Sequence, residues 1–170
     1  MKPNYHLKRD YVKGQPLHIT LMSEYALFLD PRTRQIADSV LLLYSEYFNI
    51  KLYHRALVTD HAHLILLAPS NDALSNFLRV VSGVISQKLR KLKLLPKEIK
   101  NLWRSRPWSR ILSWGRNYTT AVKYVALNYL ESTKQIFRSK NEKVRRQEME
   151  KHKLLIEMVL KMKLTVPQRA

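Results

Sequence analysis

The chain has 170 residues, a length that suits one domain with an appended element, and 45% of them are apolar, which excludes wholesale disorder. It contains no cysteine, which excludes disulfides and thiolate metal sites. Thirty-one Lys and Arg against thirteen Asp and Glu give a net charge of +18. Because residues 1–13 lack the apolar stretch of a signal peptide and no apolar run is long enough to span a bilayer, we expect a cytoplasmic protein without membrane contact.

The excess positive charge is concentrated in two stretches. Residues 1–78 carry eight basic and seven acidic side chains, whereas residues 79–116 carry eleven basic and one acidic, and residues 132–170 carry eleven and four. The first basic stretch also holds the three tryptophans: Trp103, Trp108 and Trp114. Basic side chains interleaved with aromatic ones favour a nucleic acid with exposed bases as the partner. A solvated basic surface and a membrane surface fit this pattern less well.

Hydropathy patterns predict four elements in the N-terminal half. Residues 17–22 alternate between apolar and polar side chains, which predicts a strand, and residues 32–47 have apolar side chains at helical spacing after Pro31. Residues 50–58 alternate again. A short turn at Thr59-Asp60 then leads into a third strand over residues 61–68.

Three further elements and a terminal helix follow. One apolar stripe predicts a long helix, and its residues are Leu74, Phe77, Leu78, Val81, Ile85, Leu89 and Leu92. Residues 108–113 could form a short strand, and a helix over 119–131 would be capped by Asn117 or Thr119. Apolar residues between 154 and 162 predict a terminal helix.

The tight turn before the third strand predicts an antiparallel sheet, with the helices on one of its faces. The expected fold class is therefore α+β. The expected domains are residues 1–131 and a basic helical extension over 132–170.

His61 and His63 lie two positions apart on the third strand, so both imidazoles project from the same face. Such a pair can hold one divalent ion, but alone it fits two half-buried strand histidines equally well. The apolar run over residues 64–67 favours a buried, central strand, where the histidines need partners and a metal would serve. The chain has no His-Glu-x-x-His helix, acidic cluster or Gly-rich phosphate loop, which argues against zincins, two-metal nucleases and nucleotide hydrolysis.

Four segments together resemble one family. They are Leu17-His18-Ile19-Thr20-Leu21, Asp60-His61-Ala62-His63-Leu64-Ile65-Leu66, Leu102-Trp103-Arg104 and Tyr124-Val125-Ala126-Leu127-Asn128. In this order they resemble the single-tyrosine HUH transposases, and most of all the REP-associated tyrosine transposase branch. The resemblance spans roughly residues 15–131. The chain departs from many relatives at Tyr129, where they have Pro, and at Asp60, where they have Asn.

The resemblance implies a ferredoxin-like HUH nuclease fold and a reaction. His61, His63 and Asn128 would bind Mg²⁺ or Mn²⁺, and Tyr124 would be the nucleophile that cleaves and rejoins single-stranded DNA, near hairpins, through a 5′-phosphotyrosine. Helix geometry agrees, because residues 124 and 128 share one helix face, whereas Tyr129 points about 140° away from Tyr124 and Tyr118 falls too early.

The basic stretches supply the candidate phosphate contacts: Arg79, Lys88, Arg104, Arg106, Arg110 and Arg116. Trp103 and Trp108 are expected to pack under the sheet rather than stack on bases. The C-terminal extension could clamp DNA or mediate dimerisation, and both a monomer and a homodimer that exchanges the tyrosine helix stay open. Two alternative functions also stay open, a nucleic-acid binder that has lost catalysis and a metal-dependent RNA endonuclease that does not use the tyrosine.

Overall fold

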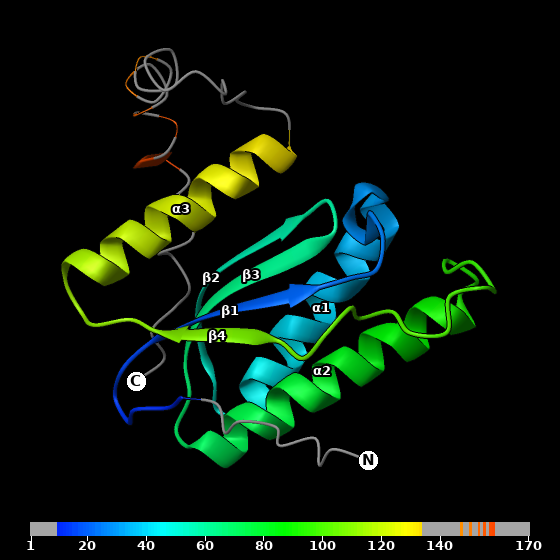
Figure 1. The fold of residues 1–170 in the computed structure, drawn as a ribbon, viewed down its shortest axis with the longest axis horizontal. Coiled ribbons are helices and arrows are strands. Elements are labelled where there is room, and N and C mark those ends of the chain that lie inside the picture. The colour runs from blue at the N-terminus through cyan, green and yellow to red at the C-terminus, as the bar shows by residue number, and fades with distance from the viewer. Residues whose placement is uncertain are drawn as a thin grey trace, which may run out of the picture.

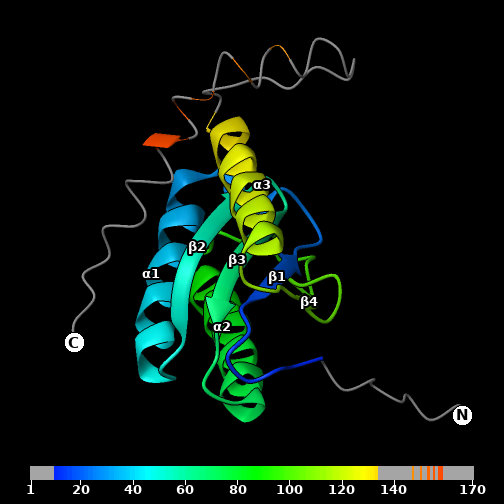
Figure 2. The same cartoon turned by 90° about the vertical axis from the view of Figure 1, so that its left-hand side faces the viewer.

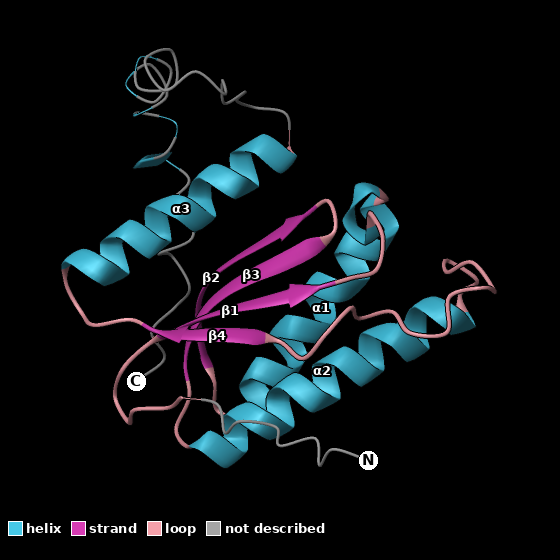
Figure 3. Ribbon diagram, viewed as in Figure 1, coloured by secondary structure: helices cyan, strands magenta, loops and turns pink. Residues whose placement is uncertain are grey.

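The computed structural model describes residues 10–133 and six positions of the C-terminal extension, all helical: Gln147, Glu150, Lys153, Leu155, Glu157 and Met158. The elements follow in the order β1 (Leu17–Met22), η1 (Leu27–Leu29), α1 (Pro31–Tyr47), β2 (Lys51–Val58), β3 (His61–Leu67), α2 (Asn71–Lys91), β4 (Trp108–Ile111) and α3 (Arg116–Ser132) (Figures 1 and 3). Each strand and helix predicted between residues 17 and 131 is present. Most of the helix predicted over 154–162 lies outside the described residues.

The four strands form one antiparallel sheet in the order β2-β3-β1-β4. The prediction that β3 is central is therefore confirmed, and β1 lies beside it. In their register Thr20 lies opposite His63 on one side and opposite Trp108 on the other. This pairing brings together segments that are far apart in the sequence.

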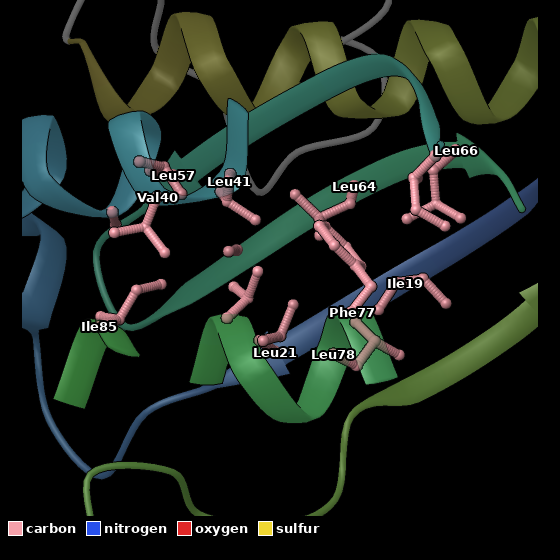
Figure 4. Packing of buried hydrophobic residues seen from close by; sticks show 14 of the residues in the cluster. Ile19, Leu21, Val40, Leu41, Leu57, Leu64, Leu66, Phe77, Leu78 and Ile85 are labelled. Carbon is pink, nitrogen blue, oxygen red and sulfur yellow. The ribbon is translucent and has the colours of Figure 1, made fainter. Parts of the chain in front are cut away.

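One face of the sheet packs against α1 and α2. Alternate residues of β1 and β3, such as Ile19 and Leu64, contribute fully buried side chains to this core, and Phe77 from α2 and Leu41 from α1 meet them (Figure 4). Helix α2 begins after Ser70, whose side chain accepts a hydrogen bond from the Ala73 amide. The apolar stripe predicted for this helix forms its buried face.

Helix α3 covers the opposite face of the sheet, so the expectation that the helices lie on one face is wrong for this helix (Figures 1 and 2). Val122 and Val125 pack there against Ala56 and Ile65. The physical reason lies in β3, where Leu64, Ile65 and Leu66 are all fully buried. A strand that is apolar at consecutive positions has to be covered on both faces.

The start of α3 also differs from the prediction. The helix begins at Arg116, and its N-cap is Gly115 rather than Asn117 or Thr119. Gly115 has a φ of +91°, a conformation that residues with a Cβ rarely adopt. Within the described part of the chain, no helix combines the length and apolar character needed to cross a membrane.

Candidate active site

The two histidines of β3 converge on the face that α3 covers. The Nε2 atoms of His61 and His63 lie 3.0 Å apart, and the two rings meet edge to face. His63 is 4% exposed, whereas His61 is partly buried at the end of the strand. The two imidazoles thus project from the same face of the strand, as predicted.

Acceptors at the other ring nitrogens determine which nitrogen of each imidazole can bind a metal. The Asp60 carboxylate lies 2.7 Å from Nδ1 of His61, and since a carboxylate accepts, this Nδ1 carries the proton. Nδ1 of His63 lies 3.1 Å from His18 Nε2 and 3.3 Å from Thr20 Oγ1. When Nδ1 of His63 donates to one of these acceptors, both Nε2 atoms face each other as lone pairs.

His18 is a site residue to which the sequence analysis assigned no role. It lies on β1 and is 8% exposed, and it reaches His63 only because β1 pairs with β3. The available signal was its position on the polar side of an alternating strand that directly precedes the first helix. That pattern does not reveal which strand will become the neighbour.

Burial keeps His63 and His18 neutral. It lowers the pKa of His63 to about 3, with smaller contributions from the positive charges that His61 and His18 would carry. Burial also lowers the pKa of His18 to about 4, aided by the nearby guanidinium of Arg110. A neutral imidazole is the form that binds a metal ion, so at neutral pH no proton has to leave His63 first.

Tyr124 lies against this cluster. Its ring centroid is 5.3 Å from that of His63 and 6.0 Å from that of His18, and the side chain is 44% exposed. The Tyr124 ring is therefore not packed in the core. Tyr118 instead packs against Tyr53 and Trp114, on a different part of α3.

Asn128 lies one helical turn after Tyr124 and is 6% exposed. Its side-chain nitrogen donates a hydrogen bond to the Tyr124 carbonyl oxygen at 2.7 Å. Across the described residues, no group of three His, Asp or Glu side chains could hold a metal ion, and His18 approaches His63 from its outer nitrogen. A third ligand from the described residues would accordingly be of another type, such as an amide oxygen.

The histidine pair fits a single cation. Ligand atoms in adjacent positions around a small divalent ion lie about 3 Å apart when each bond is about 2.1 Å. The observed 3.0 Å between the two Nε2 atoms matches this spacing. Two nitrogen lone pairs at this distance repel each other unless a proton or a metal ion lies between them, so the arrangement suits a metal ligand pair.

The basic residues proposed from the sequence lie in separate places. Arg110 lies on β4, opposite His18. The pKa of the Asp60 carboxyl is lowered mainly by its hydrogen bond with His61, and the nearby positive charge of Arg104 adds a smaller contribution. Two others, Arg79 and Arg106, line a shallow groove of about 380 Å³ between α2 and the 103–107 loop. The remaining two lie on α2 and at the start of α3: Lys88 and Arg116.

The tryptophans also differ in environment. Trp103 packs against the core and donates its indole N–H to the Ser82 carbonyl oxygen at 2.9 Å, as the packing prediction expected. Trp108 does not pack under the sheet, because 53% of it is exposed and its ring meets His18 edge to face. Trp114 is 49% exposed.

Comparisons with known proteins agree with this fold. The described fold is similar to the structure of a REP-associated tyrosine transposase bound to a REP hairpin, with a TM-score of 0.60 and 18% identity over 72% of this chain and 71% of that one. It is also similar to a putative transposase from Deinococcus radiodurans R1, with a TM-score of 0.52 and 16% identity over 71% of this chain and 95% of that one.

No curated protein matches the chain in sequence. The family model described as "Transposase IS200 like" matches residues 12–132, which include both histidines of the pair, Tyr124 and Asn128. The four-stranded antiparallel sheet of this chain, with helices packed on it, is thus the fold of a transposase domain. The protein belongs to the IS200-like transposase family.

Proposed function

We propose that this protein cleaves and rejoins single-stranded DNA through a covalent bond to Tyr124. The observation that carries the proposal is the position of the Tyr124 ring, 5.3 Å from the ring of His63 and partly exposed. A nucleophile and the residues that bind the scissile phosphate have to address one point. Membership of the IS200-like family supports the same reaction.

His61 and His63 would hold one divalent ion through their Nε2 atoms, Mg²⁺ or Mn²⁺, with the amide oxygen of Asn128 as a third ligand. The ion, when bound, would neutralise charge on the scissile phosphate and polarise it. Asp60 and His18 would orient the two imidazoles from their outer nitrogens.

In the cleavage step the Tyr124 oxygen attacks phosphorus and its proton is released. The bond between phosphorus and the 3′-oxygen breaks, and that oxygen takes up a proton to become a free 3′-OH. The products are a 5′-phosphotyrosine and a 3′-OH strand. Attack by a 3′-OH on the phosphotyrosine reverses the chemistry, so strands are rejoined without nucleotide hydrolysis.

One feature supports hairpin DNA as the substrate, and another supports an active site that is built from a single chain. A structural neighbour was solved bound to a REP hairpin, which supports DNA hairpins as substrates for this chain. Tyr124 contacts His63 of its own chain, which supports a site completed within one protomer. We further propose that residues 1–131 form the catalytic domain and that the basic extension over 132–170 is an addition to it.

The test is a search for a covalent adduct. The full chain is incubated with labelled single-stranded DNA hairpins taken from the flanks of its own gene, with Mg²⁺ or Mn²⁺, and resolved on denaturing gels. We expect a slow-migrating adduct with the wild type and with Tyr118→Phe, and none with Tyr124→Phe. An adduct that persists in Tyr124→Phe would identify another nucleophile.

The same assay separates the two alternatives. DNA that binds without any adduct, across the whole hairpin set and with both metals, indicates a binding protein that has lost catalysis. Cleavage of RNA without an adduct indicates a metal-dependent RNA endonuclease.

A further inference from the structure

An exposed tryptophan borders the candidate active site on β4. Trp108 is 53% exposed, although a large aromatic side chain gains most from burial. It lies directly opposite Thr20, and its ring centroid is 5.8 Å from that of His18. Residues that lie directly opposite in an antiparallel pair share a face of the sheet, so Trp108 lies on the face of the histidine cluster.

The contact with His18 leaves most of the indole available. The two rings meet at 88°, so this contact involves the indole edge or one indole face, and at least one face has no partner in His18. Trp103, by contrast, is packed and hydrogen-bonded to Ser82. Trp108 therefore differs from Trp103 in that its indole is exposed to solvent beside the candidate active site.

Arg110 accompanies Trp108 on the same face. It lies opposite His18, two residues further along β4, at a spacing of about 7 Å. Among the residues that the structure describes, Arg110 forms no ion pair and donates no side-chain hydrogen bond, although it is close enough to depress the pKa of His18. An exposed aromatic face and an uncompensated guanidinium therefore stand side by side at the edge of the site.

We propose that Trp108 and Arg110 form a nucleotide-binding subsite, in which the indole stacks on an unpaired base and the guanidinium binds an adjacent phosphate. The proposal rests on the proposed function for the class of ligand, single-stranded DNA, but not on the cleavage step. Stacking tolerates any base, whereas a guanidinium on phosphate adds affinity that falls with salt. The subsite would hold the strand beside Tyr124.

The test compares two ligands of equal charge. Fluorescein-labelled dT8 and an abasic octamer of the same length are titrated with the full chain, without divalent ions, and followed by anisotropy. We expect Trp108→Ala to weaken binding of dT8 about 5- to 150-fold and to leave the abasic ligand unchanged. Arg110→Gln is expected to weaken both ligands by a similar factor and to reduce the salt slope by about 0.7.

Matched variants complete the design. Trp108→Phe keeps a π-face and should retain most of the preference for dT8, while Trp108→Leu keeps an apolar side chain and should lose it. Trp114 is the control, because it is 49% exposed and instead contacts Tyr53 and Tyr118. Trp114→Ala should bind both ligands like the wild type.

Equal losses on the two ligands, or no loss, in both Trp108→Ala and Trp108→Leu would overturn the subsite. Failure of the proposed function gives a different result. In that case no adduct forms, yet Trp108 variants still lose the preference for bases.

Discussion

At the scale of single residues, the site depends on hydrogen bonds made behind the histidine pair. Asp60 accepts from Nδ1 of His61, and His18 contacts Nδ1 of His63 from the neighbouring strand. Each contact favours the tautomer whose Nε2 carries a lone pair. His18 is therefore a positioning residue, because it touches neither the paired Nε2 atoms nor any reacting atom.

Replacing His18 should weaken metal binding. In His18→Ala the Nδ1–H of His63 keeps only Thr20 as an acceptor, and loss of such a partner typically costs about 10- to 100-fold in metal affinity. Calorimetric titration of the full chain with Mn²⁺ measures this directly. His54→Ala is the matched control, since His54 is also buried, at 4% exposure, but contacts Tyr118. Equal affinities in His18→Ala and the wild type would contradict the positioning role.

At the scale of elements, α3 is held by its docking and by the way it starts. Val122 and Val125 fasten it to the sheet, which places Tyr124 beside β1 and β3. The preceding β4 strand ends at Ile111, so the chain has to turn sharply before Arg116. Gly115, with its positive φ, makes that turn.

Two glycine substitutions should change stability in opposite directions. Gly115→Ala forces a Cβ into a backbone conformation that costs about 1–3 kcal/mol, so the free energy of unfolding should fall. Gly83 lies inside α2, where an added Cβ meets no atom within 4 Å, and Gly83→Ala should raise it by about 0.5–1 kcal/mol. Urea unfolding of both variants measures these values. A stabilised Gly115→Ala would show that α3 can start by another turn.

At the scale of the whole molecule, folding divides the basic stretch of residues 79–116. Its first part belongs to α2, on the face of the sheet away from the histidine cluster, and its last part forms β4, which borders that cluster. Net charge alone would attract nucleic acid to both faces. Specific phosphate contacts should depend on the basic side chains on the face of the histidine cluster.

Charge-matched double variants test this division. Arg104→Gln combined with Arg110→Gln removes two charges near the histidine cluster, and Lys88→Gln combined with Lys91→Gln removes two exposed charges at the end of α2. We expect the first pair to reduce the salt slope of single-stranded DNA binding by about 1.4 and the second to change it little. Equal effects of the two pairs would mean that the charge acts without regard to position.

Local patterns accounted for much of this protein. The strands and helices follow from periodicities within a few residues, and the His61–His63 pair and the Tyr124–Asn128 spacing follow from strand and helix geometry. The register of the sheet is not local. His18 meets His63 across 45 positions, and no pattern within β1 specifies that neighbour.

The sequence alone therefore defined the elements, the orientation of the histidine pair and the likeness to a transposase family, because backbone geometry and motif spacing are short-range properties. The tertiary structure decided that His18 joins the pair, that α3 covers the second face, that the basic stretch divides and that Trp108 stays exposed. These features depend on which apolar surfaces bury one another across the whole chain, and such long-range contacts form only when the chain folds.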